Sequence, residues 1–184
     1  MLRRALLLVA LFALVLGGGF VVAARQAPTL STATPVEVAG TEASAVFTIG
    51  DRTVRQVRYA DGGTLRYTFR LTNRGRLPVT VRGLAADQPD PRLFTYVALT
   101  GADGERDVRL GAGEDAAVTL SLAMGGCESL SARAGSFVTE VSVRTEQAGF
   151  VDHDVVLTLP EQIHTGSPRE AFCPRSTATS RPPG

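Results

Sequence analysis

The sequence predicts an all-β protein: one antiparallel β-sandwich of about seven to nine strands, preceded by one N-terminal transmembrane or signal helix. Three observations support this fold class. Apolar and polar residues alternate with period two along most of the chain after Pro35. Turn signals rich in Gly, Asn and Asp recur roughly every 8–12 residues. Outside the N-terminal apolar run, no window places apolar residues at helical spacing.

The clearest alternation lies in the stretch Thr64–Leu84, TLRYTFRLTNRGRLPVTVRGL. Every second residue is apolar in Leu65–Leu71 and again in Leu77–Val81. The segment Asn73–Arg76 separates them, and Asn and Gly adopt positive φ at little cost. We therefore expect a β-hairpin that turns at Asn73–Arg76, with one face buried against a second sheet.

The remaining strands follow from the same alternation. The last two should form a hairpin across Gln147–Gly149, and periodicity ends at Pro160. The expected strands are Val36–Val38, Ala45–Ile49, Thr53–Tyr59, Leu93–Leu99, Arg106–Leu110, Ala116–Leu122, Phe137–Val143 and Val151–Leu159. The expected core residues are Tyr67, Phe69, Leu71, Val79, Val81, Val118, Leu120, Phe137, Val141, Val155 and Leu157.

The N-terminus has the pattern of a membrane-directed segment. Two arginines in Met1–Arg4 precede Ala5–Ala24, an unbroken apolar run of 20 residues. That length spans a bilayer as a helix, and the preceding arginines keep the N-terminus in the cytoplasm. Two interpretations stay open. An uncleaved anchor matches the full apolar length, whereas a signal peptide matches the small residues Val22–Ala24. Both export the remainder of the chain, either as a single-pass membrane protein or as a secreted one.

These boundaries predict a single exported domain. We expect residues 1–4 in the cytoplasm, 5–24 as anchor or signal peptide, 25–35 as a spacer, 36–160 as the sandwich, 161–175 as a disulfide-tethered extension and 176–184 as a disordered tail.

Cys127 and Cys173 are the only two cysteines. In an exported chain an even count predicts a disulfide, which here would hold the extension against the sandwich. Closing a loop of this length stabilises a fold by roughly 4 kcal/mol in the chain-entropy model. Two unpaired buried thiols are the alternative.

Composition excludes some partners. All 19 basic residues are arginine; without Arg3, Arg4 and Arg25, 16 remain against 18 acidic residues. A mildly acidic exported domain is a poor match for nucleic acid, which requires a strongly basic face. The Ala-, Gly-, Val- and Arg-rich usage is typical of a bacterial proteome of high GC content.

No group of residues predicts catalysis, a cofactor or a metal. No Gly-x-Ser-x-Gly motif is present, and no nucleophile, base and acid can be assembled. In Asp152-His153-Asp154 a strand would point the two aspartates to solvent and His153 toward the apolar face, so the three cannot bind one ion. We therefore expect a protein that is not an enzyme and has no cofactor.

Arginines gather in one part of the sequence. The candidate face for an anionic partner comprises Arg66, Arg70, Arg74, Arg76 and Arg82. Such a face would attract an acidic protein, an anionic envelope polymer or lipid head groups. The alternative is an ordinary solvated surface neutralised by acidic residues on neighbouring strands.

The segments LTNRGRLPVTVRGL and RLGAGEDAAVTLSL resemble bacterial immunoglobulin-like modules, including CARDB-type adhesion domains. The resemblance covers about Leu65–Leu122 and is carried by Asn73, Gly75, Val79, Val81, Gly113, Glu114, Val118 and Leu120. It implies an immunoglobulin-like sandwich acting as an extracytoplasmic interaction or structural module of a bacterial cell envelope. An accessory or chaperone-like subunit that docks an acidic partner through the arginines is the alternative. The cysteine pair departs from the family pattern.

Overall fold

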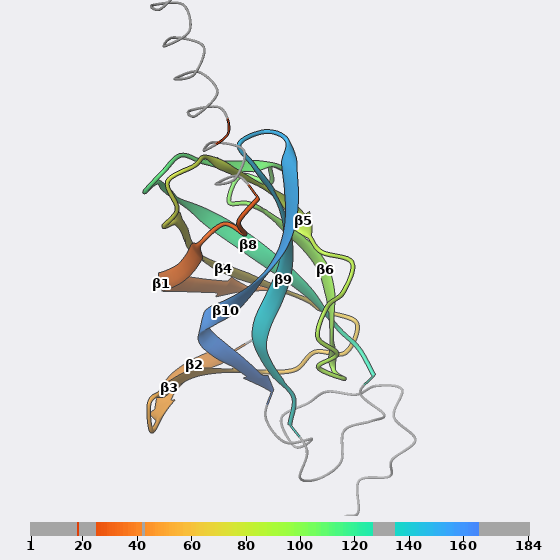
Figure 1. Cartoon of the computed structure of the whole chain (residues 1–184). Coiled ribbons are helices and arrows are strands. Elements are labelled where there is room, and N and C mark those ends of the chain that lie inside the picture. The colour runs from red at the N-terminus through yellow and green to blue at the C-terminus, as the bar shows by residue number, and fades with distance from the viewer. Residues whose placement is uncertain (1–17, 19–24, 42, 127–134, 166–184) are drawn as a thin grey trace, which may run out of the picture.

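The structure is a computed structural model and describes residues 18, 25–41, 43–126 and 135–165. The described residues form two packed sheets, as Figure 1 shows. The expected all-β sandwich is therefore confirmed, but the described residues contain ten strands instead of the expected seven to nine, and one strand pair is parallel. The strands are β1 (Leu30–Ala39), β2 (Ser44–Ile49), β3 (Arg52–Val57), β4 (Thr64–Asn73), β5 (Val79–Leu84), β6 (Phe94–Gly101), β7 (Val108–Leu110), β8 (Asp115–Met124), β9 (Phe137–Gln147) and β10 (Val151–Thr165).

One sheet has four strands in the order β1-β4-β8-β6, and the other has six in the order β2-β3-β10-β9-β5-β7. The expected N-terminal helix lies outside the described residues. Within that part of the chain, no helix has the length and apolarity that a membrane span requires.

The apolar faces of the two sheets pack against each other and form one core. Of the expected core residues, nine are at most 2% exposed and Val155 is partly buried. Phe137 was predicted to be buried, and this is wrong, because its side chain is 49% exposed. The alternation of β9 is broken once, since Val138 and Val141 are both buried although they lie three residues apart. This break places Phe137 on the outer face, opposite His164 of β10.

The predicted hairpin at Asn73–Arg76 is also wrong. β4 pairs with β1 and β8, whereas β5 pairs with β7 and β9 in the other sheet. The chain therefore crosses between the sheets after Asn73. Every second residue of a strand faces the core whether the next strand pairs with it in the same sheet or packs against it from the other sheet. The alternation of apolar residues therefore does not distinguish these two arrangements. The connection from β7 to β8 crosses in the same way.

The expected hairpin across Gln147–Gly149 is confirmed by the antiparallel pairing of β9 with β10. β10, however, continues past Pro160, where the sequence lost its periodicity. Its residues Gln162–Thr165 pair in parallel with Val54–Val57 of β3. The ladder to β9 is irregular between Thr158 and Ile163, and such an irregularity accommodates a proline that cannot donate a hydrogen bond. At the other end, β1 already begins at Leu30, inside the expected spacer.

The β2–β3 hairpin is an insertion between two strands that are neighbours. β1 and β4 pair directly, with Ala39 opposite Arg66. The residues between them cross to the other sheet and add β2 and β3 beyond β10. In Figure 1 this hairpin projects from the lower left of the sandwich.

Candidate interaction site

β2 is the outermost strand of the six-stranded sheet. In the described structure its only strand partner is β3, so its second edge is open. All six residues, SAVFTI, are exposed, and none is charged, proline or glycine. Val46, Phe47 and Ile49 are 49%, 37% and 57% exposed. Natural edge strands usually carry lysine, proline or a bulge that discourages pairing with another chain. β2 carries none of these protections.

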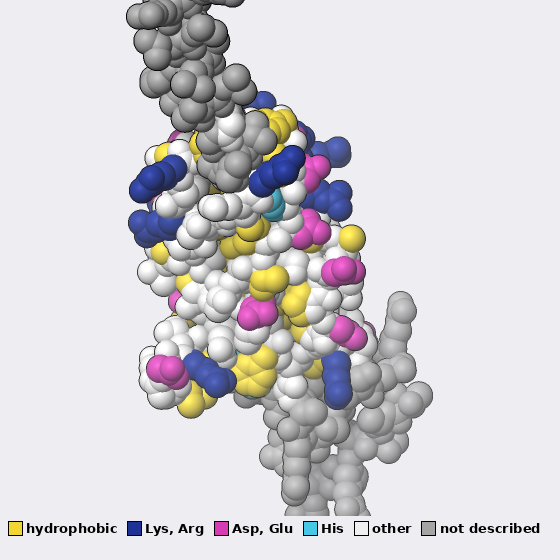
Figure 2. All heavy atoms as spheres, in the orientation of Figure 1, with side chains coloured by type: hydrophobic (Ala, Val, Ile, Leu, Met, Phe, Trp, Pro, Cys, Tyr) yellow, Lys and Arg dark blue, Asp and Glu magenta, His cyan; other side chains and the backbone are white. Residues whose placement is uncertain are grey.

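Apolar side chains also lie on the face of the sheet that carries Phe47. Phe47 pairs directly with Val54 of β3, and residues that pair directly point to the same face. Two strands further on, the ring of Phe137 packs on His164 with 4.3 Å between centroids. In Figure 2, hydrophobic side chains lie among a few charged ones at the lower end of the molecule, where the hairpin projects.

The base of the hairpin is fastened to the sandwich by an ion pair. Arg55 of β3 donates from Nε and Nη2 to the Glu161 carboxylate of β10, at 2.5 and 3.2 Å. The two side chains are 13% and 8% exposed. Tyr67 of β4 donates its hydroxyl to the Glu161 carbonyl at 3.0 Å and accepts from the Glu161 N–H at 3.1 Å. Val57, at the end of β3, is fully buried in the core. The hairpin is therefore positioned firmly at its base while β2 stays exposed.

The arginines selected from the sequence do not form one face. Arg66 and Arg70 share the outer face of the four-stranded sheet, where Arg70 Nε donates to Asp115 at 2.7 Å. Arg82 lies in the other sheet and contacts Glu146 at 2.5 Å and Asp107 at 3.4 Å. Arg74, in the connection after β4, donates to Ser31 Oγ at 3.0 Å, and Arg76 is exposed in the same connection. Neighbouring polar groups therefore neutralise or engage several members of the set.

Among these five arginines, Arg66 differs in its surroundings. It makes no ion pair with any described residue, and it lines a shallow hollow of about 410 Å³. The Thr68 and Thr119 hydroxyls, 2.8 Å apart, lie in the same hollow. Glu37 pairs with Thr68 and so belongs to this face as well. The other lining residues are Ala39, Thr100, Ala102, Gly104 and Ser121.

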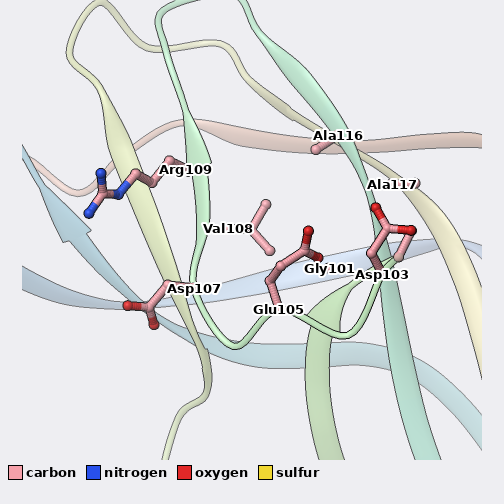
Figure 3. Close-up of a pocket in the computed structure, with 9 residues that line it drawn as sticks. Gly101, Asp103, Glu105, Asp107, Val108, Arg109, Ala116 and Ala117 are labelled. Atoms are coloured by element: carbon pink, nitrogen blue, oxygen red, sulfur yellow. The ribbon is translucent and has the colours of Figure 1, made fainter.

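A second hollow, of about 390 Å³, lies beside the β6–β7 connection and is drawn in Figure 3. Asp103, Glu105 and Asp107 line it. The carboxylates do not all converge, since Asp107 points to the opposite side from Glu105 in Figure 3 and pairs with Arg82. Across the described residues, no group of three or more His, Cys, Asp or Glu side chains is arranged to hold a metal ion.

The other residues singled out in the sequence have structural surroundings. Asp152 and Asp154 are exposed and His153 is partly buried, as the alternation predicts. Asp154 approaches Arg144 at 3.8 Å. Cys127 and Cys173 both lie outside the described residues, so their disulfide stays a prediction. The sequence did not reveal the open edge of β2, because strand order is invisible in a periodic pattern; the uncharged run SAVFTI was the available signal.

Comparisons with known proteins show no family. No family model matches the chain, and no curated protein matches it. Several solved structures align over part of it, among them the following two. One is the cupredoxin domain of amoB from Nitrosocaldus yellowstonii, with 12% identity, a TM-score of 0.28, and 66% of this chain and 65% of that one covered. The other is the periplasmic chaperone SfaE, with 9% identity, a TM-score of 0.30, and 72% and 57% covered. The chain thus spans less than two thirds of either structure.

Fold and surface together define a class: an all-β sandwich that presents an open, uncharged edge strand.

Proposed function

We propose that this chain is a non-enzymatic interaction module on the outer side of a bacterial cell membrane, and that it binds by adding a strand to β2. The observation that carries the proposal is the open edge of β2, with six exposed and uncharged residues. A strand added to such an edge gains backbone hydrogen bonds, while side chains on both faces supply specificity.

The proposal includes an immunoglobulin-like sandwich. The order β1-β4-β8-β6 corresponds to A-B-E-D of an immunoglobulin constant domain, and β10-β9-β5 corresponds to G-F-C. β7 then extends the second sheet on one side, and the β2–β3 hairpin extends it on the other. The hairpin is thus an addition to a complete sandwich. An addition that contributes an exposed edge is better explained by binding than by stability.

Location outside the cytoplasm rests on the sequence Met1–Ala24, two arginines followed by 20 apolar residues. A reporter that is active only outside the cytoplasm, fused after Gly184, is expected to be active in the host. An inactive reporter would overturn the proposed location and with it the function. Mass analysis of the native protein then separates an anchor from cleavage near Ala24. Thiol counting on the same material is expected to find no free thiol, because Cys127 and Cys173 are predicted to be bridged.

A second candidate function is an accessory subunit that docks an acidic partner at Arg66. The observation that favours it is the hollow lined by Arg66 together with the hydrogen-bonded Thr68 and Thr119. Binding of the full chain to phosphatidylglycerol vesicles should then weaken in Arg66→Gln and with added salt. Arg76→Gln, an exposed arginine in a connection, is the matched control. Equal binding by both variants would remove this candidate.

A further inference from the structure

We propose that the strand added to β2 is β2 of a second copy of this chain, antiparallel to the first. The two-fold axis lies midway between Phe47 of one copy and Phe47 of the other. This inference rests on the proposed function and narrows the partner to the chain itself. The joined edges would make one continuous sheet from the six-stranded sheets of two copies.

Symmetry limits the registers that two identical strands can adopt. A two-fold axis perpendicular to the sheet keeps each side chain on its own face. Directly paired residues must share a face, so the central pair consists of one residue and the same residue of the other copy. An axis centred between two successive residues would pair side chains from opposite faces. In the register centred on Phe47, this residue pairs with Phe47 of the other copy, and Ala45 lies opposite Ile49. It also places Val46 opposite Thr48. All five residues Ala45–Ile49 are then paired.

The side chains complement one another in this register. On one face two phenylalanines meet at the centre, and the small Ala45 lies against the large Ile49 on either side. Aromatic pairs and β-branched pairs are favourable cross-strand contacts. On the other face, Val46 meets the methyl-bearing Thr48. An axis through Val46 would instead leave Ile49 beyond the paired residues, with its side chain 57% exposed. The register centred on Phe47 therefore covers more apolar surface than the register centred on Val46.

Charge does not oppose this contact. None of the six residues of β2 is charged, so no like charges meet across the axis. A contact between two short strands nevertheless buries less area than a standard interface. Anchoring in one membrane would raise the effective concentration of the two copies, which compensates for weak pairing. The test therefore uses the full chain in its host membrane.

Cysteine cross-linking tests both partner and register. In Phe47→Cys, two introduced thiols would lie on directly paired residues, where Cα atoms are about 4.5–5.5 Å apart and a disulfide can form. After mild oxidation in membranes, we expect most of the Phe47→Cys protein to form a disulfide-linked dimer that a reducing agent separates. Ile49→Cys alone should stay monomeric, because its two copies would be about 13 Å apart along the strands. Co-expressed Ala45→Cys and Ile49→Cys chains of different mass should form the mixed dimer.

The wild-type chain, carrying only Cys127 and Cys173, sets the background. Three results would overturn the inference: no dimer from Phe47→Cys, equal dimer from Ile49→Cys alone, or a Phe47→Cys adduct with the mass of another protein. Adding Phe47→Lys to the co-expressed Ala45→Cys and Ile49→Cys chains should abolish their mixed dimer in membranes, with an unchanged unfolding midpoint. A dimer that survives this substitution would also contradict the inference. An inactive C-terminal reporter would instead signal failure of the proposed function.

Discussion

The Arg55 guanidinium and the Glu161 carboxylate meet in a nearly buried pair that joins β3 to β10, with Nε and Oε2 2.5 Å apart. Both side chains are at most 13% exposed. β3 and β10 pair in parallel only over Val54–Val57 and Gln162–Thr165. The ion pair therefore reinforces a short ladder that carries the whole β2–β3 hairpin.

Removing one member of this pair should be costly, because the other charge stays buried without a partner. We expect Glu161→Ala to lower the free energy of unfolding by about 3–5 kcal/mol. Arg70→Gln is the control, since the pair of Arg70 with Asp115 is 48% and 39% exposed and should contribute at most about 1 kcal/mol. Urea unfolding of the two variants measures the difference. Similar losses would contradict the buried character of the Arg55–Glu161 pair.

Two phenylalanines that the sequence pattern treats alike should respond differently to the same substitution. Phe69 is 1% exposed in the core, whereas Phe137 is 49% exposed. Phe69→Ala should therefore lower the free energy of unfolding by about 3–5 kcal/mol. Phe137→Ala should lower it by about 1 kcal/mol or less. Chemical denaturation of both variants decides, and a larger loss at Phe137 would show that the alternation of β9 is not broken.

The alternation predicted the fold class and nearly all of the core. In a strand of either sheet every second residue faces the core, and those residues must be apolar. Val118 and Leu120 are examples, both fully buried. Phe137 was misplaced because one irregularity in the ladder between β9 and β10 shifts the phase. The hairpin at Asn73 was misassigned because the same alternation suits a connection within a sheet and one between sheets. Long-range partners decide between these, and they are not encoded locally.

Asn73 makes long-range contacts of this kind, so it does more than form a turn. Its side chain is fully buried, and Nδ2 lies at 2.8, 3.2 and 3.1 Å from the carbonyl oxygens of Leu77, Leu110 and Gly111. Two of the connections that cross between the sheets, β4–β5 and β7–β8, therefore bind one amide. Asn73→Asp keeps the oxygen that accepts from the Gly75 N–H but loses every donor. We expect this variant to lose about 1–3 kcal/mol or more in thermal unfolding. A loss as small as that of Arg74→Ala would contradict this role.

The three tyrosines should ionise late. Burial, and after it Glu140, raises the pKa of the Tyr96 hydroxyl to about 12, and burial also raises the pKa values of Tyr59 and Tyr67. An unfolded chain releases these protons near pH 10. Stability should thus be complete below about pH 10 and decrease as the pH rises toward 12. Phenolate absorbance should accordingly appear above pH 10, together with unfolding. A full tyrosine titration near pH 10 in the folded protein would contradict the burial.

The interaction site was less accessible to prediction than the fold. The sequence suggested five arginines, and the structure distributes them over both sheets and a connection. The open edge of β2 depends on strand order, which arises from the parallel pairing of β3 with β10 after the periodicity has ended at Pro160. A short uncharged strand such as Ser44–Ile49 looks in sequence like any interior strand. Only its place at the end of the sheet leaves its second edge open.

In the proposed function, β2 pairs with another strand in the membrane. Amide hydrogen exchange of Ser44–Ile49 tests this most directly, because the N–H groups that do not face β3 are open in the isolated chain. The full chain is measured in membranes at high and low density. We predict slow exchange of this segment at high density, and fast exchange on dilution and in Phe47→Lys. Equally fast exchange of Ser44–Ile49 at every density would contradict the account.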